Sequence, residues 1–82
     1  MEIRGTCVYF RTEGMIFFKE RDNHKCNTIR RFEDWKELKT FQENIDKLKT
    51  IRIWSMHDGF FEREITDITK WEGYYIISWK PV

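Results

Sequence analysis

One segment of the chain, from Phe32 to Lys49, carries apolar residues at the spacing of a helix. Its apolar positions are Trp35, Leu38, Phe41, Ile45 and Leu48. Steps of three and four residues place such side chains on one face of a helix. Because no other segment shows so clear a helical stripe, the rest of an 82-residue chain has to complete the core with strands. This length suits one domain, spanning residues 1–82.

The remaining apolar segments are rich in β-branched and aromatic residues, which favour strands. They are residues 2–10, 15–20, 50–56, 60–68 and 74–80. Short connections containing glycine, at residues 11–14 and 70–73, predict a hairpin at each end of the chain. Residues 21–31 lack apolar periodicity and read as a loop.

This order predicts an α+β fold in a single small domain. Its elements run ββαβββ, with one amphipathic helix packed on a five-stranded, mainly antiparallel sheet. A β-grasp-like arrangement and a simple meander crossed by the helix both fit the order.

A single helix covers only one face of such a sheet. Strand alternation places Tyr75, Ile77 and Trp79 under the helix and turns their neighbours outward. Aromatic residues form 17% of the chain, so the outward face keeps an apolar remainder. Its candidate partner-binding residues are Phe17, Arg52, Trp54, Met56, Phe60, Tyr74 and Ile76. Trp, Tyr and Arg dominate binding energy at interfaces, although the loop at residues 21–31 could instead cover this face.

The net charge is +1, but one segment is locally basic. Its five cations are Lys19, Arg21, Lys25, Arg30 and Arg31, against two acidic residues, Glu20 and Asp22. A basic loop beside an aromatic sheet face suits single-stranded nucleic acid or RNA, because bases stack on rings and phosphates attract arginine. Glu62 and Glu64 on the same face weigh against that interpretation.

No motif in the sequence indicates catalysis or a metal. Ser55, His57 and Asp58 lie too close along the chain for a catalytic triad, whose members meet through the fold. Cys7 and Cys26, with His24 and His57, lack the paired spacing of a zinc site. We therefore expect no catalytic residue, no metal and no cofactor. The two cysteines are expected to be free thiols in the cytoplasm, with a disulfide or a metal or redox role as alternatives.

These observations together predict a small, non-catalytic protein-interaction module. Isoleucine far outnumbers leucine and alanine is absent, which suggests an AT-rich coding source. By analogy of type alone, the expected role is that of a phage or mobile-element protein that blocks a host defence complex, as anti-CRISPR inhibitors do. The expected partner is a larger protein or ribonucleoprotein. A single-stranded nucleic-acid-binding domain is the alternative, and a homodimer through the same face is a third interpretation. No apolar stretch is long enough to span a membrane.

Overall fold

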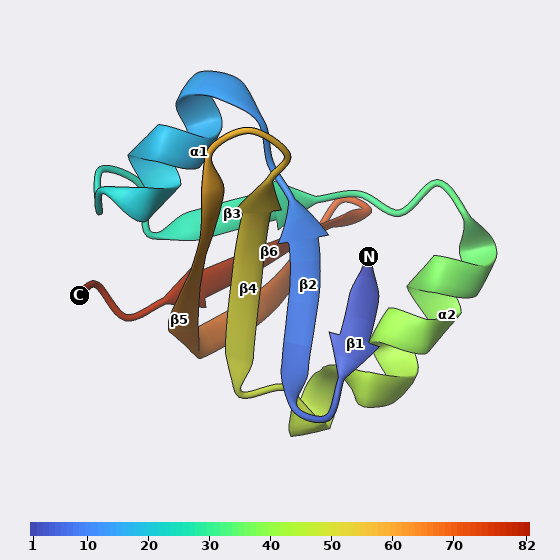
Figure 1. Cartoon of the computed structure of the whole chain (residues 1–82). Helices are drawn as coiled ribbons and strands as arrows, with labels where there is room; N and C mark the ends of the chain where they lie inside the picture. Colours follow the sequence, from blue (N-terminus) through green and yellow to red (C-terminus); the bar gives the residue numbers. More distant parts are fainter.

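The protein is an α+β domain with two helices and a mixed six-stranded sheet, described by a computed structural model of residues 1–82 (Figure 1). The strands are β1 (Glu2–Arg4), β2 (Cys7–Arg11), β3 (Asn27–Arg30), β4 (Thr50–Ser55), β5 (Gly59–Trp71) and β6 (Tyr74–Trp79). The helices are α1 (Gly14–Arg21) and α2 (Trp35–Asn44), and a short 3-10 helix, η1 (Ile45–Lys47), follows α2. The predicted class is confirmed, whereas the predicted ββαβββ order and strand number are wrong.

The largest departure from prediction is the segment at residues 15–20, which forms helix α1 instead of a strand. Gly14 has a φ of +69°, which lets the chain turn out of the sheet at that point. Phe17 and Glu20, three residues apart, are the two buried side chains of the helix. Lys19 and Arg21 in its last turn suit the negative end of the helix dipole. Tertiary burial therefore overrides the β preference of Ile16, Phe17 and their neighbours.

The sheet has the order β1-β2-β4-β5-β6-β3. Strands β2 and β4 pair in parallel, and the other pairs are antiparallel. Parallel neighbours need a long crossover, which α1, β3 and α2 supply. The predicted loop at residues 21–31 therefore contains an edge strand, β3, and does not lie across the sheet as a cover.

A β-bulge in β5 bends the sheet into two layers. Ile65 pairs with Trp79 and Asp67 with Ser78, so Thr66 is an extra residue on β5. Bulges bend a strand and increase its twist. In Figure 1, β1, β2, β4 and the first part of β5 form the front layer, and β6 and β3 cross behind it.

The core fills the space between these two layers and the helices. Its buried apolar residues are Val8, Phe10, Phe17, Phe41, Leu48, Ile51, Ile53, Phe61, Tyr75, Ile77 and Trp79. Phe41 of α2 packs on Tyr75, with ring centroids 4.9 Å apart, and Phe17 of α1 packs on Phe61 at 5.4 Å. The inward placement of Tyr75, Ile77 and Trp79 is confirmed.

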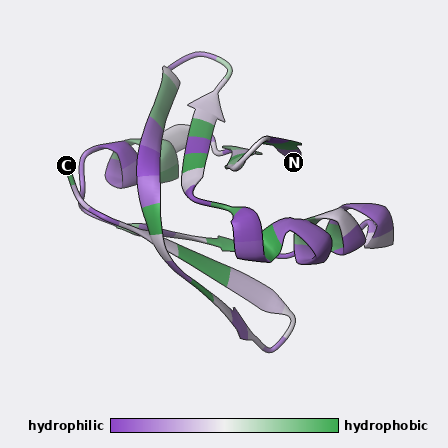
Figure 2. Ribbon diagram, turned by 90° about the horizontal axis from the view of Figure 1, so that it is seen from below, coloured by the Kyte–Doolittle hydropathy of each residue, from purple (hydrophilic) through white to green (hydrophobic).

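Helix α2 is the predicted amphipathic helix, shortened at both ends. Its N-cap is Asp34, whose carboxylate accepts a hydrogen bond from the Lys36 N–H at 2.9 Å. Trp35 lies in the first turn and is 66% exposed, so the predicted apolar stripe begins at Leu38. Figure 2 shows α2 as a mostly hydrophilic ribbon with a few hydrophobic positions, as expected for a helix that packs with one side only.

Candidate functional site

No helix covers the outer side of the front layer in Figure 1. Strand alternation directs aromatic and arginine side chains to that side. The strand register aligns Tyr9 with Arg52 in one row and Arg11 with Trp54 and Phe60 in the next. We call this surface the arginine–aromatic face and define it as Arg4, Tyr9, Arg11, Arg52, Trp54 and Phe60. Residues opposite each other on paired strands share a face, so β1, β2, β4 and β5 bring these side chains together.

Each arginine of the face stacks on a ring. The guanidinium carbon of Arg52 lies 4.2 Å from the centroid of the Phe60 ring and 5.2 Å from that of Tyr9. The guanidinium carbon of Arg4 lies 5.1 Å from the centroid of the same Tyr9 ring. Arg11 is 5.5 Å from the Trp54 ring centroid. Cation–π contacts of this kind restrain both partners and stabilise by about 0.5–1 kcal/mol at exposed sites.

Each of the same arginines also forms an ion pair with a nearby glutamate. Arg4 contacts Glu2 at 2.7 Å, and Arg52 contacts Glu62 at 2.8 Å. The hydrogen bond that Arg4 Nε donates to the Glu2 carboxylate raises the pKa of Arg4 above its ordinary value. Glu64, which pairs in register with Thr50, adds a further carboxylate to the outer side. The surface therefore combines stacked guanidinium groups with a slight excess of acidic residues.

Glu13 holds one corner of the face in place. Its carboxylate accepts hydrogen bonds from Arg11 Nε at 2.6 Å, from the Met56 N–H at 3.0 Å and from Ser55 Oγ at 2.8 Å. These contacts join the end of β2 to the turn after β4, on which Met56 lies. The hydrogen bonds from Arg11, Met56 and Ser55 lower the pKa of Glu13 to about 2.

This network predicts a pH dependence of stability. A carboxyl whose pKa falls on folding stabilises the protein above its unfolded pKa, and that contribution disappears as pH falls through the folded value. The Glu13 contribution is therefore complete above the ordinary glutamate pKa of 4.5 and is lost as pH falls through the folded pKa of about 2. The difference in melting temperature between wild type and Glu13→Gln should be constant at neutral pH and shrink towards zero at pH 2. A flat difference over this range, or the same trend in Glu72→Gln on the exposed β5–β6 turn, would contradict the assignment.

The sequence-predicted partner-binding residues do not all share this surface. Arg52, Trp54 and Phe60 belong to it, and Met56 adjoins it on the following turn. Phe17 does not, because it lies on α1 and is fully buried against Phe61. This placement corrects the prediction that assigned it to the outward face.

Tyr74 and Ile76 are also separated from Trp54. They lie on β6, in the back layer, where Ile76 pairs with Ile29 and Tyr74 with Trp71. The prediction assumed a flat sheet and therefore assigned these residues to one face. The bend in β5 places them on two different surfaces.

The sequence-based prediction did not include three members of the face, namely Arg4, Tyr9 and Arg11. The alternation of β2, in which Val8 and Phe10 are buried and Tyr9 and Arg11 lie between them, carries the signal for two of them. Their pairing with Arg52 and Trp54 depends on the parallel register of β2 and β4.

The predicted basic loop is not a continuous basic surface. Lys19 and Arg21 lie on α1, and Arg21 pairs with Asp22 at 2.8 Å. Lys25 contacts the buried carboxylate of Glu20 at 3.1 Å.

The last two cations of the predicted loop lie against aromatic rings. The guanidinium carbon of Arg30 lies 4.7 Å from the Phe10 ring centroid, and burial lowers the pKa of Arg30 below its ordinary value. Arg31 lies against Tyr74 in the back layer.

The residues considered for catalysis or metal binding are arranged as follows. The Ser55 hydroxyl donates to Glu13, and the Asp58 carboxylate is 3.1 Å away, so carboxylates and not His57 surround this hydroxyl. Cys7 and Cys26 are both free. No group of three or more His, Cys, Asp or Glu side chains is placed to hold a metal ion.

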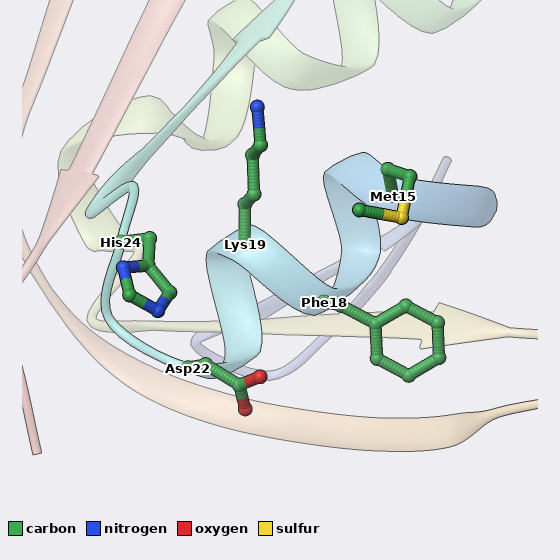
Figure 3. A pocket seen from close by; sticks show the side chains of 5 residues that line it. All are labelled: Met15, Phe18, Lys19, Asp22 and His24. Carbon is green, nitrogen blue, oxygen red and sulfur yellow. The ribbon is translucent and has the colours of Figure 1, made fainter.

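The most spacious hollow, about 540 Å³, lies on the exposed side of α1. Figure 3 shows its five lining side chains: Met15, Phe18, Lys19, Asp22 and His24. The polar ends of Lys19, Asp22 and His24 point in different directions there, and no hydrogen bond joins them. This geometry offers no convergent set of groups for acid–base or nucleophilic chemistry.

Neither helix has the length and apolar character needed to cross a membrane. No protein-family model matches the chain, and no curated protein matches it either.

Proposed function

We propose that this chain is a non-catalytic protein-interaction module that binds a larger protein through the arginine–aromatic face. The supporting observation is the stacking of Arg52 on Phe60 and of Arg11 on Trp54 across neighbouring strands. Arginine and tryptophan are enriched among the few residues that dominate binding energy at protein interfaces. Trp54 is 37% exposed and Phe60 58% exposed, so apolar surface remains available to a partner.

The ion pairs favour a protein partner over a nucleic acid. Glu2, Glu13 and Glu62 pair with the three arginines of the face and offset their charge, so the face has no net positive charge to attract phosphates. Binding that depends on phosphates requires a clear excess of available cations. Ring stacking and ion pairing also order the arginines before binding, which lowers the entropy lost when a complex forms.

The proposal extends to inhibition. A domain of this size blocks a partner by covering the surface that the partner needs. A host defence complex is proposed as the partner class by analogy with anti-CRISPR inhibitors alone. No chemistry by the inhibitor is required for that effect.

Capture from a lysate of the native host, followed by mass spectrometry, would identify the partner, and binding to the purified partner would then be measured. We expect Trp54→Ala to weaken this binding by roughly 30-fold or more, since central aromatic residues contribute 2 kcal/mol or more. Trp71→Ala is the matched control, because Trp71 is 62% exposed on the other layer.

Two outcomes would overturn the assignment. One is that Trp54→Ala binds as tightly as wild type while its circular dichroism is unchanged. The other is that Trp71→Ala loses as much affinity as Trp54→Ala. If a purified nucleic acid binds, and its affinity falls steeply with added salt and with Trp54→Ala, the chain would instead be a single-stranded nucleic-acid-binding domain.

A further inference from the structure

A second recess lies between α1 and the free edge of the sheet at β3, with Thr12 directly after β2 also lining it. It measures about 310 Å³. Ile16 and Glu20 line it from α1, Thr28, Ile29 and Arg30 from β3, and Lys25 from the turn between them. Ile16 and Ile29 are each more than half exposed, whereas Glu20 and Thr28 are buried. The recess thus has apolar walls at its mouth and polar groups at its base.

The outer edge of β3 has backbone groups directed away from the sheet. The Trp79 N–H donates to the Cys26 carbonyl at 3.0 Å, so residue 26 bonds to β6. In an antiparallel pair every second residue does so. Thr28 and Arg30 therefore bond to β6, while Asn27 and Ile29 direct their N–H and C=O groups to the free edge. The Asn27 carbonyl accepts a hydrogen bond from Lys25 Nζ at 2.8 Å, which leaves Ile29 as the open position.

The charges that a ligand can reach in the recess are positive. The Glu20 side chain has no exposed surface, and its Oε1 lacks a hydrogen-bond partner. Lys25 remains 31% exposed, and its two hydrogen bonds leave one ammonium N–H. Arg30 donates to Thr28, to the Arg11 carbonyl and to Thr12, which leaves two of its five N–H groups. Such cationic donors form strong, charge-assisted hydrogen bonds to a carboxylate.

We infer that the α1–β3 recess binds an extended acidic segment of a partner protein, which adds to β3 as a further strand. A residue opposite Ile29 would exchange both backbone hydrogen bonds with it and share its outer side. The next residue, opposite Arg30, would direct its side chain to the inner side, where the recess lies. An Asp or Glu at that position meets the remaining N–H groups of Arg30 and Lys25. Recognition by strand addition uses this division between backbone bonds and alternate side-chain pockets.

To test this inference, peptides are selected on the immobilised protein from a phage-displayed library of random twelve-residue sequences. The affinity of the best peptide is then measured by fluorescence anisotropy. Selected peptides should share an acidic residue beside an apolar or β-branched one. Replacing that acidic residue by its amide should weaken binding by about tenfold, and affinity should fall with added salt, since partly exposed charges are screened. Failure to select any peptide, or selection of peptides without acidic residues, overturns the inference.

Two variants locate the binding. Ile29→Pro removes the outward N–H but no hydrogen bond to β6, and proline is tolerated on sheet edges. Ile16→Glu places a negative charge at the mouth of the recess and keeps the fold measurable if the proline variant is unstable. Each variant should weaken binding of the selected peptide at least tenfold. The matched controls, Ile29→Val and Met15→Glu, should leave this binding unchanged.

Three further results separate the alternatives. Trp54→Ala should leave peptide binding unchanged, so this site and the arginine–aromatic face fail or succeed independently. Equal binding by wild type and Ile16→Glu would overturn the inference. So would sedimentation that shows a wild-type dimer and an Ile29→Pro monomer, because the edge would then belong to a second copy of the chain.

Discussion

Replacing Lys25 by alanine should destabilise the fold by about 3 kcal/mol, the lower end of the usual effect of breaking a buried ion pair, because only the Glu20 side of this pair is fully buried. The Glu20 side chain has no exposed surface, and Lys25 Nζ, 3.1 Å away, supplies its hydrogen bond. Without Lys25 the carboxylate stays buried with neither oxygen bonded, because Oε1 already lacks a partner. Denaturant unfolding measures the loss directly.

The charge explanation has its own control. Glu20→Gln keeps the shape of the side chain and removes the buried charge, so it should change stability much less than Lys25→Ala. The double variant, Lys25→Ala with Glu20→Gln, should recover most of the loss. If the double variant is as unstable as Lys25→Ala alone, the packing of the lysine stem and not the charge of Glu20 accounts for the effect.

Phe17→Ala should also destabilise the protein by about 3–5 kcal/mol, because it opens a cavity in the core. Phe17 is fully buried and packs on Phe18 and Phe61, with ring centroids 5.6 Å and 5.4 Å away. A domain of this size has a total stability of roughly 4–12 kcal/mol, so the variant could lose most of its folded population. Urea unfolding, or a thermal melt at fixed pH, checks the size of the loss.

Met15→Ala is the matched comparison, and it also tests the helix. In a strand, Met15 and Phe17 share a face and respond alike. In a helix, residues two apart lie on nearly opposite sides, and Met15 is 72% exposed. The change at Met15 should therefore alter stability by less than about 0.5 kcal/mol, as surface substitutions usually do. Similar losses at both positions would indicate the strand.

Local pattern was sufficient where each residue's environment follows from its neighbours along the chain. The stripe through Leu38 and Phe41 specifies a helix that buries one side. The alternation in Thr50–Ser55 and Tyr74–Trp79 specifies strands and their inward faces. In both cases the hydrophobic period matches one backbone geometry, and burial of that face stabilises it.

Prediction from the local pattern was wrong where the same residues are compatible with two backbone geometries, such as a helix and a strand. Met15 to Lys19 has the composition of a strand, but a helix there covers the open end of the core with Phe17. Thr66 carries no sign that it is a bulge, and its insertion reverses the alternation, so that Ile65 and Ile68 both pack on the core. A prediction that assumes strict alternation therefore assigns every residue after the bulge to the wrong face of the sheet.

The candidate site divides in the same way. Arg52, Trp54 and Phe60 were predicted from sequence because alternation within residues 50–56 and 60–68 directs each of them outward, and the two strands pair across a short turn. Tyr9 and Arg11 join them through a parallel pairing that spans the crossover of residues 12–49, which no local signal encodes. Tyr74 and Ile76 were assigned to the same face because a sequence cannot show that the sheet bends.

The sequence by itself determined the α+β class, the amphipathic helix and the inward faces of β4 and β6, because those depend on hydrophobic period and burial within short segments. Tertiary structure alone decided that residues 15–20 are helical, that β2 lies beside β4, and that the sheet bends at Thr66. Those outcomes depend on contacts between segments distant in the chain, whose combined burial outweighs local preference. The arginine–aromatic face and the α1–β3 recess both result from that second kind of decision.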